Sequence, residues 1–142
     1  MNFSLEVGPH TDLDTLPPVK DVYVTMLPGG DYKETAEKSG DLVKKGFNPV
    51  PHFPARSIAD EAQLKDYISR CKDVGAKQAL VIGGSREPIG KFDSSIQILE
   101  TGFFDGIKIG IAGHPEGSQD ISDTELEKAM IDKKPYTDYI VT

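Results

Sequence analysis

The sequence predicts an α/β fold in which strands and helices alternate around a parallel sheet. Short runs of β-branched and aromatic residues are separated by longer amphipathic stretches, which is the pattern of repeated βα units. Six such runs begin roughly 20 to 30 residues apart, about the length of one unit. This rhythm favours a (βα)8 TIM barrel, which typically needs about 250 residues. We therefore expect residues 1–142 to form one βα-barrel domain that is incomplete at its C-terminus and supplies the first five βα units and the start of strand six.

A second architecture also fits the alternation of strands and helices. An open, doubly wound sheet of the flavodoxin type matches a chain of 142 residues better than a whole barrel does. Such sheets usually have about five strands, whereas this chain has six strand starts. The barrel is therefore the favoured one of two open alternatives.

Six segments carry the strand pattern. The third is the weakest, because Pro49 and Pro51 cannot donate to a strand ladder, but it lies where the rhythm requires a strand. The expected strands cover residues 3–7, 21–26, 48–53, 78–82 and 107–112, with a sixth beginning at residue 139.

Helices are expected between these strands. Asp31 is placed to cap the first helix and Gly46 to end it. The second helix has apolar residues at three- and four-residue spacing and stops at Gly75. The expected helices cover residues 31–45, from 57 or 60 to 75, 93–102 and 120–134.

Composition and charge exclude several classes of partner. No apolar run approaches the roughly 20 residues that cross a bilayer, and the first residues lack the pattern of a secretory signal. Cys71 is the single cysteine, which fits a reducing compartment. The net charge of −7 argues against binding a nucleic-acid backbone. We expect a cytoplasmic protein with no membrane or nucleic-acid partner.

Polar residues lie at the carboxyl ends of the expected strands. In βα barrels this rim holds the active site, so the residues are expected to form one pocket. Each also has a structural alternative, such as a hydrogen-bonded core histidine or a turn residue. Because no second ligand stands at metal spacing, no metal site is expected. The set comprises Glu6, Thr25, His52, Ser85, His114 and Glu116.

Glu6 is the main candidate for catalysis. It alternates with Leu5 and Val7 in the first strand, so its side chain would point into the barrel. Burial there would favour the protonated carboxyl, which suits a general acid. Pairing with a lysine at the rim is the structural alternative.

Two glycine-containing loops could bring backbone N–H groups close to a phosphate. They are Pro28-Gly29-Gly30-Asp31 and Gly83-Gly84-Ser85. Neither matches the P-loop or the dinucleotide-binding pattern, so turn formation is the default interpretation. Ser85 has no GxSxG sequence around it, which argues against a hydrolase nucleophile.

Several short motifs occur together in a distinctive order. They are Ser4-Leu5-Glu6-Val7 with Pro9, Tyr23-Val24-Thr25, Val50-Pro51-His52, Ala79-Leu80-Val81-Ile82 before Gly84, Ile109 to Gly117, and Asp138 to Thr142. In this order and spacing the chain resembles the methylenetetrahydrofolate reductases along its whole length. The segment Ala112-Gly113-His114-Pro115-Glu116-Gly117 is the most distinctive part.

The resemblance implies a βα barrel that carries FAD and reduces 5,10-methylenetetrahydrofolate to 5-methyltetrahydrofolate with NAD(P)H as co-substrate. By position, Glu6 would protonate the folate substrate. Thr25 and His52 would contact the flavin, and His114 would take the place of a flavin-contacting tyrosine. Lys133, or Lys134 in the other register, would meet the phosphates of the cofactor.

One motif departs from the family. An Arg-Gly-Asp sequence usually follows strand four and supports cofactor binding, whereas this chain has Gly83-Gly84-Ser85. The departure leaves an alternative function, a catalytically altered paralogue that binds folate or flavin without turnover. A flavodoxin-like binding module is a third alternative. The oligomeric state is left open, a homo-oligomer included.

Overall fold

The computed structural model describes residues 5–27, 30–83, 87–112 and 139–141. The strands are β1 (Leu5–Val7), β2 (Asp21–Val24), β3 (Asn48–Pro54), β4 (Gln78–Ile82), β5 (Lys108–Ala112) and β6 (Tyr139–Val141). The helices are α1 (Tyr32–Lys44), α2 (Glu61–Asp73) and the short α3 (Ser95–Leu99), with 3₁₀ turns η1 (Leu13–Thr15) and η2 (Ala55–Ser57). The expected α/β alternation is therefore confirmed.

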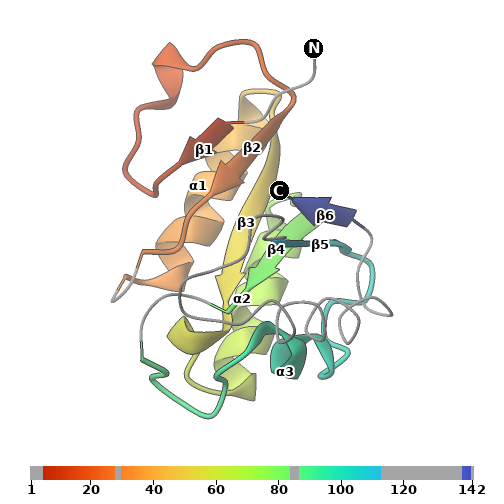
Figure 1. The fold of residues 1–142 in the computed structure, drawn as a ribbon. Helices are drawn as coiled ribbons and strands as arrows, with labels where there is room; N and C mark the ends of the chain where they lie inside the picture. The colour runs from red at the N-terminus through yellow and green to blue at the C-terminus, as the bar shows by residue number, and fades with distance from the viewer. Residues whose placement is uncertain (1–4, 28–29, 84–86, 113–138, 142) are drawn as a thin grey trace.

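The strands form one parallel sheet in the order β1-β2-β3-β4-β5-β6 (Figure 1). Flavodoxin-type sheets have the order 2-1-3-4-5, so that alternative is wrong. Crossovers between parallel strands are almost always right-handed, so an unreversed strand order places successive helices on one face. Helices α1 and α2 accordingly lie side by side on the same face of the sheet (Figure 1).

The helix boundaries follow the capping residues in the sequence. The Asp31 side chain accepts a hydrogen bond from the Lys33 N–H at the start of α1, and Asp60 does the same for Gln63 at the start of α2. Gly46 and Gly75 follow these helices with φ of 89° and 101°, where other residues would be strained. The expected helix over 93–102 is shorter than predicted, and the one over 120–134 lies outside the described residues.

Strand β3 forms although it contains three prolines, Pro49, Pro51 and Pro54. Asn48 donates its backbone N–H to Lys20 O on the β2 side at 2.9 Å. Successive N–H groups of a parallel strand point to opposite neighbours, so the positions of Pro49 and Pro51 face β4. Pairing with β4 begins only at His52. The donors missing at Pro49 and Pro51 therefore interrupt no ladder, and Pro54 lies beyond the last residue of β3 that pairs with β2.

The core lies between the sheet and the two long helices. Its larger cluster joins α2 to the middle strands, with Phe53 stacked on Tyr67 at a ring-centroid distance of 4.0 Å. The smaller cluster joins α1 to the first strands and comprises Val7, Leu13, Val22, Val24 and Leu42. Alternate residues of each strand supply this face, so the residues between them point to the other face.

Tyr67 connects the core to the candidate site. It is fully buried, and its hydroxyl donates to the backbone carbonyl of His52 at 2.7 Å. Replacing Tyr67 with Phe should lower the free energy of unfolding by about 1–3 kcal/mol, because the carbonyl loses its donor in a buried place. Urea denaturation measures this change. The matched variant is Tyr32→Phe, whose partner Asp66 keeps a hydrogen bond to Arg70. Equal losses in both variants would contradict the role assigned to Tyr67.

Candidate functional site

The face of the sheet opposite α1 and α2, here called the second face, brings the candidate residues together. Register partners in a parallel sheet point to the same side. Glu6 pairs with Tyr23 and Tyr23 with Val50, which forms one row across β1, β2 and β3. The next row toward the carboxyl ends contains His52 and Leu80. Glu6 and His52 therefore lie on one face, as the sequence predicts.

His52 is the most informative residue of this face. Only 9% of it is exposed, and its Nε2 atom is buried without a hydrogen-bond partner among the described residues. Its ring meets the Tyr23 ring edge-on, with centroids 6.1 Å apart and planes at 63°. Buried polar atoms usually have a partner. The structural alternative for His52 is a hydrogen-bonded core histidine. The described residues do not provide the hydrogen bond at Nε2 that this alternative needs.

The electrostatics of His52 come from burial and from Glu6. Burial lowers the pKa of the imidazole below its usual range, and the negative charge of Glu6 acts against this by raising it. The neutral ring is therefore favoured at neutral pH. A neutral imidazole has one donor nitrogen and one acceptor nitrogen, so it can either give or accept a hydrogen bond at Nε2.

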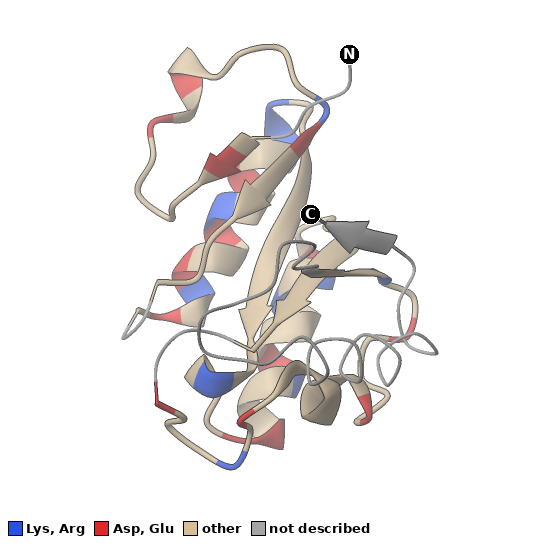
Figure 2. Cartoon of the chain, viewed as in Figure 1, with Lys and Arg blue, Asp and Glu red and all other residues tan. Residues whose placement is uncertain are grey.

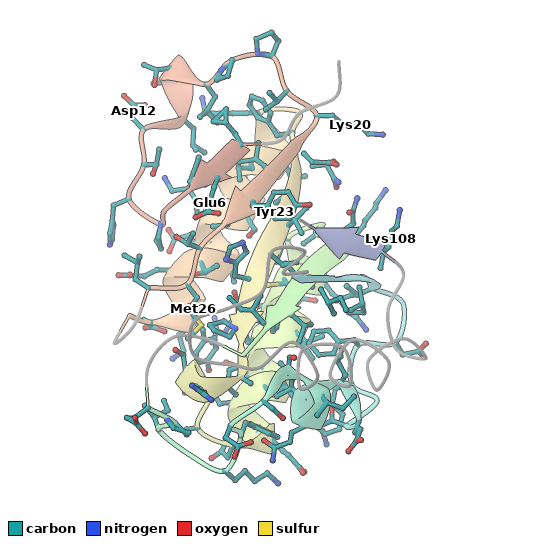
Figure 3. All side chains as sticks on the ribbon, viewed as in Figure 1. Glu6, Asp12, Lys20, Tyr23, Met26 and Lys108 are labelled. Atoms are coloured by element: carbon teal, nitrogen blue, oxygen red, sulfur yellow. The ribbon has the colours of Figure 1, made fainter. Side chains whose placement is uncertain are left out.

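Glu6 does not have the burial that the sequence pattern suggests. It is exposed, although Val7 beside it is buried on the helix face. The reason is tertiary, since β1 is an edge strand that pairs with β2 alone in the described sheet. Glu6 and Tyr23 lie on these two neighbouring strands in Figure 3. In Figure 2, β1 carries this acidic residue while β3 and β4 carry no Asp, Glu, Lys or Arg.

Thr25 lies just beyond β2 and is bound to its neighbours. Its backbone N–H and its hydroxyl both donate to Val7 O, at 2.9 and 3.3 Å. Its carbonyl accepts from the Thr35 hydroxyl of α1 at 3.1 Å. These contacts give Thr25 a structural role at the carboxyl end of β1. Its hydroxyl oxygen can still accept a hydrogen bond. Four other expected residues, Gly84, Ser85, His114 and Lys133, lie outside the described residues, as does Glu116.

Two residues of this region are not among the site residues that the sequence predicts. Tyr23 packs against His52, and Arg56 follows β3 in η2. The alternation of Tyr23 with Val22 and Val24 is the only sequence signal for its face. No local sequence pattern indicates a functional role for Arg56.

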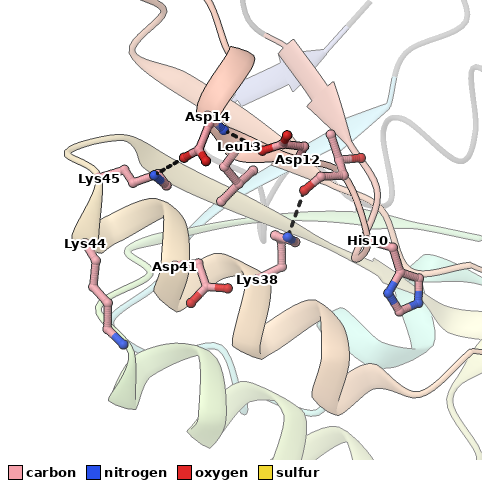
Figure 4. Close-up of a pocket in the computed structure, with 9 residues that line it drawn as sticks. His10, Asp12, Leu13, Asp14, Lys38, Asp41, Lys44 and Lys45 are labelled. Carbon is pink, nitrogen blue, oxygen red and sulfur yellow. Dashed lines mark hydrogen bonds and ion pairs between the residues drawn. The ribbon is translucent and has the colours of Figure 1, made fainter.

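A surface pocket of about 580 Å³ lies elsewhere, between the segment around η1 and helix α1 (Figure 4). Lys45 pairs there with Asp14 at 2.7 Å, and Lys38 donates to Thr11 O at 2.8 Å. The lysine ion pair lowers the pKa of the Asp14 carboxyl. Because the ion pair is exposed and Lys38 already donates to a carbonyl, the pocket is a solvated surface and a weaker site than the second face.

Other kinds of chemistry find little support in the described part of the chain. No group of His, Cys, Asp and Glu side chains there could hold a metal ion. Cys71 is buried, and burial raises the pKa of its thiol to about 12, so it is no nucleophile at neutral pH. None of the described helices has the length and apolar character needed to span a bilayer.

No protein-family model matches the chain. The resemblance to the methylenetetrahydrofolate reductases therefore stays a prediction from the sequence motifs.

The pKa of His52 predicts a pH-dependent stability. An unfolded histidine titrates near 6.5, and the folded value lies below it. Between these two values the unfolded chain binds more protons, so the free energy of unfolding should fall as the pH drops through this window. His52→Asn should remove that part of the pH dependence, as measured by urea denaturation from about pH 8 to pH 5. The control is His10→Asn at an exposed site. A wild-type pH profile in the His52 variant would rule out this account.

The effect of Glu6 on His52 can be measured directly. Glu6→Gln removes the charge that raises the pKa of His52, so this pKa should fall further in the variant. Proton NMR of the imidazole Cε1–H against pH reports it. Glu34→Gln is the matched control, since Glu34 is an exposed residue beside His10. An unchanged His52 titration in the Glu6 variant would show that the two groups do not interact across the second face.

Proposed function

We propose that the protein is a flavin-dependent oxidoreductase of the methylenetetrahydrofolate reductase type, which interconverts 5,10-methylenetetrahydrofolate and 5-methyltetrahydrofolate with NAD(P)H. The sequence motifs around Glu6, Thr25 and His52 support this function. The observation that carries it is that Glu6 and His52, whose Nε2 has no partner among the described residues, lie on one face of the sheet. A cytoplasmic location and a folate substrate are parts of the same proposal.

A βα barrel is the proposed architecture. The six parallel strands stand in sequential order, and α1 and α2 share one face of the sheet. A barrel has this arrangement around its strands, with helices outside and side chains of the other face inside. In that architecture the second face would line the barrel interior near the rim where barrel enzymes bind substrates.

The residues present fit a flavin on two counts. His52 offers a buried ring nitrogen that lacks a partner among the described residues, and an isoalloxazine ring carries both acceptors and donors at its edge. Tyr23 and Leu80 supply aromatic and apolar surface beside it. Thr25 and His52 are the described residues that would hold the cofactor, FAD. The chemistry that a bound FAD supplies is hydride transfer between NAD(P)H and the folate.

The carboxyl of Glu6 would serve as the acid for the folate. Opening the five-membered ring of methylenetetrahydrofolate requires a proton on the departing nitrogen, and a glutamic acid can donate it. Glu6 is exposed, so a substrate that covers the second face can reach it.

A second function has support from one position. Gly83 stands where the family has the arginine of its Arg-Gly-Asp motif, so part of the usual cofactor contact is missing. A paralogue that binds folate or flavin without turnover would tolerate this change. The two functions differ in whether bound flavin is reduced and reoxidised.

The test is the spectrum of the purified protein together with one variant. The enzyme should be yellow with FAD, bleach with NAD(P)H and recover its colour with methylenetetrahydrofolate. Glu6→Gln should leave reduction by NAD(P)H nearly intact and slow the folate half-reaction by roughly 10²- to 10⁴-fold, because only that step needs the proton. Stopped-flow absorbance separates the two half-reactions.

The control for this experiment is Glu37→Gln, an exposed site on α1. It should leave both half-reactions unchanged. Flavin binding without reoxidation by the folate would favour the non-catalytic paralogue. A colourless protein that takes up neither FAD nor folate would refute both functions.

A further inference from the structure

Arg56 occupies a junction at the carboxyl end of the sheet. It lies in η2, directly after β3 and four residues beyond His52. Its backbone N–H donates to Gly83 O at 3.0 Å, and its carbonyl accepts from the Ile89 N–H at 3.0 Å. The Arg56 Nε–H donates to the carbonyl of Asp93 at 2.9 Å. The residue thus joins the end of β3 to the end of β4 and to the segment before α3.

The charge of Arg56 has no counter-charge in the described part of the chain. Arg70, the other arginine there, pairs with Asp66 at 2.8 Å, whereas Arg56 forms no ion pair with any described carboxylate. Arg56 is half-buried, and a charge that is partly removed from water is costly without a partner. This is notable in a chain with 23 acidic and 16 basic residues, where carboxylates are plentiful.

The guanidinium keeps donors that the described residues do not use. Arginine carries five N–H donors, and the single bond at Nε holds the planar group in place. No described acceptor takes the Nη donors. A guanidinium with free Nη atoms suits the bidentate binding of two oxygens of a phosphate or carboxylate. At Gly83, whose carbonyl accepts from the Arg56 backbone N–H, an added Cβ would meet no described atom within 4 Å.

We propose that Arg56 binds an anionic oxygen group of the ligand at the carboxyl end of β3. The inference rests on the proposed function. It names Arg56 as the residue that would hold a phosphate of FAD or a carboxylate of the folate tail. Both groups present paired oxygens to the same guanidinium fork. Anchoring of Nε by Asp93 O pre-orients the fork, so little side-chain freedom is lost on binding.

The first test uses small anions and the full chain. Wild type is titrated with inorganic pyrophosphate and with glutarate while the side-chain Nε–H resonance of Arg56 is followed by NMR. We expect a saturable shift of this resonance with at least one anion, and none of comparable size at Arg70. Binding measured by calorimetry should weaken roughly tenfold to a hundredfold in Arg56→Gln, because charge-assisted hydrogen bonds are lost.

Two variants separate binding from folding. Arg56→Lys keeps the charge without the fork and should retain part of the affinity. Arg70→Gln is the matched control and should bind as wild type does, because Arg70 is already paired on α2. Circular dichroism and thermal unfolding check that each variant is folded. The wild-type resonance gives a result even where Arg56→Gln does not fold.

A second set of ligands distinguishes the source of the anion. Loss of affinity for FAD but not for riboflavin in Arg56→Gln identifies a phosphate, and loss for the folate but not for pteroic acid identifies the glutamyl carboxylate. Either result supports the inference. If FAD and folate bind neither protein while pyrophosphate still shifts Arg56, the proposed function fails and the anion site stands. If both ligands bind and the Arg56 resonance responds to no anion or ligand, the inference is overturned and the proposed function stands.

Discussion

The parallel pairing of the strands in sequential order is the constraint on which the rest of the structure depends. The strands all run in the same direction and follow one another in the sheet. Right-handed crossovers between them therefore place α1 and α2 on one face. The apolar residues at alternate strand positions are then buried under these helices. The intervening residues are left to the second face, where Glu6, Tyr23 and His52 belong to three adjacent strands.

Strand β3 links the core to this face. Its odd-numbered Phe53 stacks on Tyr67 in the core, while the even-numbered His52 points to the second face and has its carbonyl bound by the Tyr67 hydroxyl. An aromatic stack of this kind and a buried hydrogen bond are each of the order of 1 kcal/mol. The backbone that carries the imidazole is thus held from the helix side. The strand ends at Pro54, and Arg56 in the following η2 turn binds Gly83 O just beyond β4.

The described ion pairs and the polar residues of the candidate site differ in their partners. Ion pairs such as Lys45 with Asp14 and Arg70 with Asp66 lie on the surface, where they contribute little to stability. The second face and its rim have Glu6, His52 and Arg56, none of which forms a described ion pair. Groups that the fold itself does not neutralise are the ones left to interact with a ligand.

The sequence by itself determined the elements that depend on local chemistry. Asp31, Asp60 and Gly75 mark helix ends because capping acts within one turn, and alternation in each strand separates its two faces. It also predicted that Glu6 and His52 share a face. The exposure of Glu6 and the strand order of the sheet were decided by the tertiary structure, as were the Tyr23 contact with His52 and the anchoring of Arg56. These features depend on the register between strands distant in the chain, which no local pattern encodes.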